Sequence, residues 1–214
     1  DELAGTFIMG NTFDYTTEHA RAISSAKKYN IVSCSVDAVE IGSVNLADYN
    51  AVDLIEGLEE NDGHSLVAYK SFSTTLQQKI LDYLNGHGRL FVSGAYIGSD
   101  MTSDGEKTFL ANALKVNYNG QNRDQINTVV TGMGTQMDVW RAINEQHYAA
   151  VSADVLNAVG QGYCAMKYAD GTSAAVAYDG TDYKTFTMGF PVECIKDVNT
   201  RRAVIKGIIA FILK

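Results

Sequence analysis

The chain has 214 residues, 46% of them hydrophobic and 20% charged, a balance typical of a folded protein with a buried core. Its formal net charge of −8 excludes a nucleic-acid-binding protein, because phosphate binding requires a basic surface. We expect no membrane insertion, since the longest apolar stretch, residues 205–213, is short and contains Lys206 and Gly207.

The first half of the chain alternates between apolar runs of strand length and segments with helical spacing. Strands are predicted at residues 6–9, 31–34, 51–55 and 90–92. Helices are predicted at residues 17–29, 74–85 and 103–114, the last two opened by the capping boxes Thr74/Gln77 and Ser103/Glu106. This alternation predicts βαβ units and a mainly parallel sheet with helices on both faces.

The second half has the signals of antiparallel strands. Asp170-Gly171 and Asp179-Gly180 are turn sequences between alternating segments. A last strand is predicted at residues 186–190 and a closing helix at 200–213, whereas residues 117–160 carry weak signals. We therefore expect one α/β domain over residues 1–214. Its fold would be a three-layer α/β/α sandwich, with a mainly parallel sheet and antiparallel edge strands near the C-terminus.

Cysteine usage and motif spacing indicate neither a metal site nor a cofactor. Three cysteines are too few for a disulfide scaffold, and the sequence leaves open whether Cys164 and Cys194 pair. Asp14 with His19, or Glu56 with Glu59, could donate to a metal, but none of them has the spacing of a known metal motif. A glycine-rich phosphate loop is also absent from the sequence.

Polar residues follow several of the predicted strands. In an open parallel sheet, ligands bind outside the carboxyl ends of the strands, so these residues are candidates for a ligand-binding cleft. For each residue alone, a role as a helix cap or a turn residue is an equally good explanation. Five loops that all carry polar residues, however, favour a binding site. The candidates are Asn11, Asp14, His19, Glu56, Ser93, Ser99 and Asp100.

The turn after the fourth predicted strand is the most specific feature. Gly94-Ala95-Tyr96-Ile97-Gly98 resembles a nucleophile elbow, in which a serine or cysteine stands between two glycines. Here Tyr96 takes that position, and a phenol with an ordinary pKa of about 10 is a poor acyl nucleophile. No histidine follows the last strand, and His19 is the histidine best placed near the carboxyl edge. A nucleophile–histidine–acid triad is therefore not expected.

Three stretches, residues 49–57, 84–94 and 188–193, resemble the class I glutamine amidotransferase-like superfamily, which has a flavodoxin-like fold. The resemblance implies that Gly57 holds the oxyanion position and that Glu193 keeps the acid. Tyr96 replaces the catalytic cysteine, and the histidine of the family's His-x-Glu pair is absent. The resemblance therefore implies the fold but argues against glutamine hydrolysis.

Residues 32–40 and 91–100 resemble more narrowly a domain of secreted polysaccharide-degrading proteins that are called xanthan lyase-like. The chain begins at Asp1 without a methionine, so we expect a fragment of a longer multidomain protein that is secreted, periplasmic or on the cell surface, its signal removed. One hypothesis is an accessory, non-catalytic domain that binds a polysaccharide or neighbouring domains. The alternative is a polysaccharide lyase or hydrolase in which Tyr96 and the cleft carboxylates transfer protons.

Overall fold

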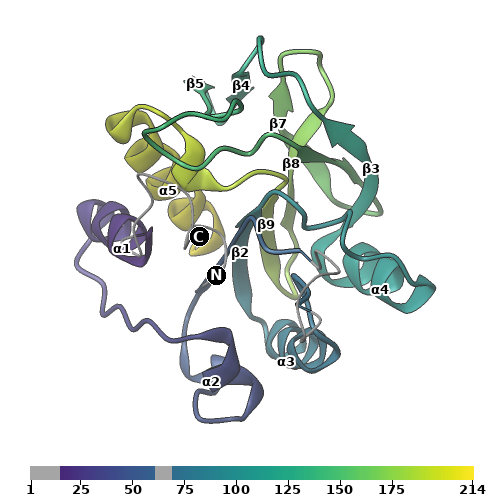
Figure 1. Ribbon diagram of the computed structural model, residues 1–214. Helices are drawn as coiled ribbons and strands as arrows, with labels where there is room; N and C mark the ends of the chain where they lie inside the picture. The colour runs from purple at the N-terminus through teal and green to yellow at the C-terminus, as the bar shows by residue number, and fades with distance from the viewer. Residues whose placement is uncertain (1–14, 61–68) are drawn as a thin grey trace.

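The computed structural model describes residues 15–60 and 69–214 (Figure 1). Its α-helices are α1 (Tyr15–Ala26), α2 (Val36–Glu40), α3 (Thr74–Asn85), α4 (Asp104–Phe109) and α5 (Val198–Ile212). Its strands are β1 (Val52–Gly57), β2 (Arg89–Gly94), β3 (Val116–Asn122), β4 (Val129–Gly132), β5 (Thr135–Asp138), β6 (Ala153–Ala158), β7 (Tyr163–Tyr168), β8 (Ser173–Asp179) and β9 (Lys184–Met188). Short helical turns are η1 (Leu46–Asp48), η2 (Leu110–Leu114) and η3 (Val192–Cys194).

Seven strands form a curled, mixed sheet in the order β1-β2-β9-β8-β7-β4-β5 (Figure 1). The pairs β1–β2 and β2–β9 are parallel, whereas β9–β8, β8–β7, β7–β4 and β4–β5 are antiparallel. A separate antiparallel pair, β3–β6, packs against β8. The sheet is therefore parallel only at its β1 end.

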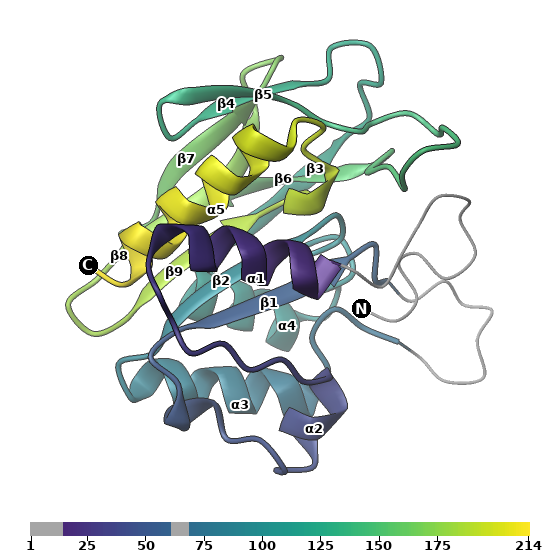
Figure 2. The same ribbon diagram turned by 90° about the vertical axis from the view of Figure 1, so that its left-hand side faces the viewer.

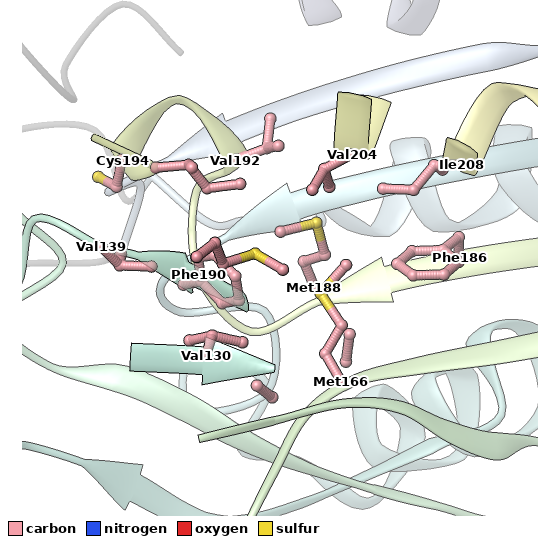
Figure 3. Close-up of a cluster of buried hydrophobic side chains, with 14 of the residues drawn as sticks. Val130, Val139, Met166, Phe186, Met188, Phe190, Val192, Cys194, Val204 and Ile208 are labelled. Carbon is pink, nitrogen blue, oxygen red and sulfur yellow. The ribbon is translucent and has the colours of Figure 1, made fainter. Parts of the chain in front are cut away.

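Each face of the sheet buries its own apolar cluster. Helices α1 and α5 lie side by side across one face (Figure 2). There α5 contributes Val204 and Ile208 to a cluster with Phe186 and Met188 of β9 and Met166 of β7 (Figure 3). The second cluster lies on the other face, where α3, α4 and η2 pack against β2, β3, β6 and Val176 of β8.

The predicted three-layer sandwich on a mainly parallel sheet is wrong. The structure is a half-barrel of seven curled strands, and most of its neighbouring pairs are antiparallel. The strands predicted at the edge instead make up β7, β8 and β9, and β8 lies in the middle of the sheet. The hairpin β4–β5, in the region of weak signals, forms the far edge. The sheet continues beyond its parallel strands as antiparallel hairpins. The helices on the second face therefore cover only part of the sheet.

Most of the individual elements were predicted near their observed positions. Helix α3 has the expected bounds, although Ser73 and not Thr74 caps it, since the Ser73 hydroxyl accepts from the Leu76 N–H. The capping box Ser103/Glu106 and both Asp-Gly turns are confirmed. The strand predicted at residues 31–34 is wrong: this segment forms no strand, and Val32 is 56% exposed. The predicted strand 6–9 lies outside the described residues.

Two further expectations concern cysteines and membranes. Cys164 and Cys194 are both free, Cys164 at the surface and Cys194 in the core, so they do not pair. Within residues 15–60 and 69–214, no helix has the length and apolar character that a bilayer crossing requires.

Candidate functional site

The carboxyl ends of β1 and β2 lie side by side, since Gly57 is the register partner of Gly94. Gly57 has φ +54°, a conformation that favours glycine, and its carbonyl accepts from the Ala95 N–H at 2.8 Å. Gly94 is equally constrained, because a Cβ there would lie 2.7 Å from Cβ of Glu56. Glycine is therefore required at both strand ends, by backbone conformation at Gly57 and by the close approach of Glu56 at Gly94.

The turn after β2 does not have the backbone of a nucleophile elbow. An elbow strains its central residue at the start of a helix, but Tyr96 is not among the residues with positive φ, and the next helix, α4, begins only at Asp104. Burial, and then the carboxylates of Glu60 and Asp154, raise the pKa of Tyr96 to about 12. The phenol is therefore protonated at neutral pH. This is the opposite of what a tyrosine base or nucleophile requires.

Asp154 of β6 holds this turn. Its Oδ2 accepts the backbone N–H of Gly98 at 2.6 Å and that of Ser99 at 2.8 Å, and the side chain is fully buried. Burial raises the pKa of Asp154 to about 6, although the two N–H donors oppose the shift. The sequence analysis missed Asp154 because it lies in the region of weak signals. An aspartate inside the apolar run 153–156 was the available sign.

Asp100 fixes the end of the same turn to the segment before α3. Its Oδ2 accepts from the Ser71 N–H at 2.9 Å, and its carbonyl accepts from Lys70 Nζ at 2.9 Å. Lys70 also lies 2.5 Å from the Glu106 carboxylate, which lowers the pKa of Glu106 to about 2 although partial burial opposes that shift. The predicted site residue Asp100 thus has a clear structural role.

His19 brings together two carboxylates from distant parts of the chain. It lies on α1, which crosses the β1–β2 end of the sheet (Figure 2), and its ring stacks on Phe91 of β2. His19 Nδ1 lies 2.7 Å from Asp53 Oδ2, and His19 Nε2 lies 3.6 Å from Glu193 Oε2. His19 is 2% exposed and Glu193 1%. No histidine lies next to Glu193 in the sequence, but His19 of α1 lies beside it in the fold.

The charges in this network follow from its geometry. Burial lowers the pKa of His19, but Asp53 and Glu193 outweigh it and raise the pKa from 6.5 to about 10. Burial raises the pKa of Glu193, but the charge of His19, 3.6 Å away, and the Tyr148 hydroxyl, which donates to Oε1, lower it overall. At neutral pH, His19 is thus an imidazolium between two carboxylates. An enclosed imidazolium cannot act as a general base.

Glu193 is held by its backbone as well. Arg201 of α5 donates through Nη1 to the carbonyls of Glu193 and Ile195, both at 2.9 Å. Its Nη2 donates to Glu18 of α1 at 2.8 Å. The chain of contacts from β1 through His19 and Glu193 to α5 therefore joins α1, η3 and α5 to the sheet.

The remaining predicted residues lie apart from the His19 network or outside the described chain. Glu56 is buried on the other face of β1, and burial, followed by Glu59, raises its pKa well above the ordinary value. Ser93 is fully buried in β2, and Ser99 lies on the turn. Asn11 and Asp14 lie outside the described residues. The described residues include no group of three or more His, Cys, Asp or Glu suited to hold a metal ion.

Two shallow hollows lie away from these strand ends, on the outer face of β4, β5 and β7. Both are lined by Thr131 and Gln136, so they adjoin. None of the candidate site residues from the sequence lines either hollow.

Comparison with known proteins shows a fold but no family. No protein-family model and no curated protein matches the chain. Among solved structures, an exo-β-1,4-mannosidase from Opitutaceae bacterium strain TAV5 matches with a TM-score of 0.60 and 8% identity over 98% of this chain and 33% of the mannosidase. The cytoplasmic protein STM1381 of Salmonella typhimurium LT2 matches with a TM-score of 0.57 and 11% identity, over 92% and 85% of the two chains. The cytoplasmic protein STM3548 of Salmonella typhimurium matches with a TM-score of 0.56 and 10% identity, over 97% and 92%.

At these identities the likeness extends to the fold alone. The chain spans about a third of the length of the mannosidase that it matches. Distant structural neighbours of this chain thus include a glycosidase, and the fold also occurs in chains of nearly its own length.

Proposed function

We propose that this chain is an accessory, non-catalytic domain of a carbohydrate-processing protein, which binds a polysaccharide or a neighbouring domain. The observation that carries the proposal is the state of His19. The histidine best placed for catalysis is enclosed between Asp53 and Glu193, 2.7 Å and 3.6 Å away, and a pKa of about 10 keeps it charged.

The state of Tyr96 supports the same proposal. A lyase or hydrolase that used Tyr96 for proton transfer would need its pKa lowered towards neutrality. Burial and two nearby carboxylates instead raise the pKa to about 12. With His19 unable to accept a proton and Tyr96 unable to lose one, the two residues favour a binding role over catalysis.

The carbohydrate part of the proposal draws on the mannosidase. Nearly the whole of this chain superposes on about a third of that enzyme, so the same fold occurs as one part of a longer glycosidase. In more detail, we propose that the domain is xanthan lyase-like and glutamine amidotransferase-like, as the sequence resemblances imply. A secreted or cell-surface location belongs to it as well, because an intact polysaccharide is too large to enter a cell.

The test is a turnover assay on the purified chain. Wild type, Tyr96→Phe and Glu193→Gln are incubated with neutral polysaccharides, acidic polysaccharides and acyl esters, and reducing ends, unsaturated products and released acid are measured. We expect no turnover above the rate without protein. Turnover that is lost in Tyr96→Phe or Glu193→Gln, with an unchanged circular dichroism spectrum, would overturn the proposal in favour of an enzyme.

A further inference from the structure

Two exposed tyrosines lie beside the turn of residues 94–100. Tyr69, Tyr118 and Tyr163 are 38%, 41% and 47% exposed. Tyr118 packs on the turn, since a Cβ at Gly98 would lie 2.8 Å from Cβ of Tyr118. Tyr69 directly precedes Lys70, whose ammonium donates to the Asp100 carbonyl at 2.9 Å. Two of these three tyrosines therefore flank one turn.

Tyr96 lies in the turn itself, and its side chain packs against the apolar cluster beneath α1 and α5. It is half-buried, and its carbonyl accepts from the Ser71 hydroxyl at 3.2 Å, on the Tyr69 side of the turn. On the other side, the carboxylate of Asp154 raises the pKa of both Tyr96 and Tyr118, after the larger effect of burial. Tyr69 and Tyr118 thus lie next to the turn that contains Tyr96, and Asp154 holds this turn through the N–H groups of Gly98 and Ser99.

The turn lies at the parallel part of the sheet, and ligands often bind outside the carboxyl ends of parallel strands. The turn follows the carboxyl end of β2, which has parallel neighbours on both sides. A rigid turn with aromatic rings positions a ligand at a low entropic cost. Tyrosine offers an apolar face to the C–H groups of a sugar ring and a hydroxyl for hydrogen bonding.

Charge decides between kinds of polysaccharide. The strand ends carry Glu59, Glu60 and Asp100, and the chain as a whole has a net charge of −8. Of the nearby cations, Lys70 is paired with Glu106 at 2.5 Å. Arg123 contributes one positive charge beside these three carboxylates, and its Nη2 donates to the neutral side chain of Gln121 at 2.7 Å. Such a surface repels an anionic polymer, whereas its carboxylates can accept hydrogen bonds from sugar hydroxyls.

We propose that Tyr69, Tyr96 and Tyr118 form a binding site for an uncharged polysaccharide around the turn of residues 94–100. This inference rests on the proposed function and gives its ligand class and location. The sugar rings lie against the exposed faces of Tyr69 and Tyr118, and their hydroxyls reach the polar groups of the turn.

The experiment is affinity electrophoresis and calorimetry with soluble galactomannan, xyloglucan and mixed-linkage glucan, and with polygalacturonate as the acidic probe. We expect the wild type to bind at least one neutral polymer and not polygalacturonate. Tyr118→Ala and Tyr69→Ala should each weaken that binding about tenfold. Tyr163→Ala, which removes an exposed tyrosine outside the turn, is the matched control and should leave binding unchanged. Circular dichroism and thermal unfolding confirm that each variant is folded.

The outcomes separate this inference from the proposed function. Neutral-polymer binding that survives Tyr118→Ala and Tyr69→Ala overturns the tyrosine site and leaves the accessory function standing. Loss of binding in Gln136→Ala alone would place the ligand in the hollows over β4, β5 and β7, and would also overturn it. Absence of binding to every neutral polymer overturns the inference, whereas the accessory function is overturned only by turnover.

Discussion

His19 Nδ1 lies 2.7 Å from Asp53 Oδ2, and this contact ties α1 to the edge strand β1 across 34 positions of sequence. Glu193 approaches the other ring nitrogen from η3. The three side chains come from α1, β1 and η3, and all of them are largely or fully buried. We therefore regard the network as the polar anchor of α1, a helix that otherwise packs mainly on α5.

Replacing His19 should destabilise the fold. In His19→Gln two buried carboxylates lose their shared cation, and breaking one partner of a buried ion pair costs about 3–5 kcal/mol. The measurement is the free energy of unfolding in urea. Arg21→Ala is the control on the same helix: Arg21 is 64% exposed and 3.9 Å from Glu18, so its loss should cost less than about 0.5 kcal/mol. Equal effects of the two substitutions would contradict the anchoring role.

The stabilisation by His19 should depend on pH in a defined window. The pKa of His19 is 6.5 in an ordinary environment and about 10 in the fold, so the folded state holds the proton more tightly. The contribution is therefore complete below pH 6.5 and is lost as pH rises towards 10. Unfolding free energies of wild type and His19→Gln, compared at each pH, should differ most below pH 6.5 and converge above pH 10. A difference that stays constant across this window would show that His19 is not charged in the fold.

Local sequence signals predicted the elements better than their assembly. Helix α3 was predicted with its observed bounds, because a helix that buries one face repeats apolar residues at helical spacing, as Leu76, Ile80 and Leu84 do. The turns Asp170-Gly171 and Asp179-Gly180 revealed two hairpins. A turn fixes which neighbours pair but not where the hairpin sits in the sheet, so the central position of β8 could not be derived.

The site shows the same limit. Tyr96 and His19 were selected because they follow predicted strands, and Glu193 was selected through the amidotransferase-like resemblance. The structure does bring His19 to within 3.6 Å of Glu193. Asp53 was read only as part of an apolar strand, and Asp154 fell in a region without periodicity. Asp154 lies 56 positions from Gly98, whose N–H it binds, and no local pattern encodes a contact at that separation.

Tyr96 should titrate as a buried, inactive phenol. With a pKa of about 12, it remains protonated throughout the range in which exposed tyrosines near 10 ionise. Ultraviolet difference titrations of wild type and Tyr96→Phe should therefore coincide until the pH exceeds that range. A component with a pKa below 9 that disappears in Tyr96→Phe would reveal an activated tyrosine and would favour the enzymatic alternative.

Gly189 should tolerate no side chain, because it lets the loop after β9 approach the strand that carries Asp154. A Cβ at Gly189 would lie 2.2 Å from the carbonyl oxygen of Asp154, and the Asp154 N–H donates to the Gly189 carbonyl at 2.9 Å. Gly189→Ala should therefore destabilise the fold by about 1–3 kcal/mol or more, since backbone and not a flexible side chain must move.

Gly105→Ala is the opposite control: nothing lies within 4 Å of its added Cβ in α4, and alanine should stabilise that helix by up to about 1 kcal/mol. Urea unfolding measures both variants, and a neutral Gly189→Ala would show that the two backbones can separate without cost. Because Asp154 binds the turn of residues 94–100, Gly189→Ala should also weaken polysaccharide binding, whereas Gly105→Ala should not.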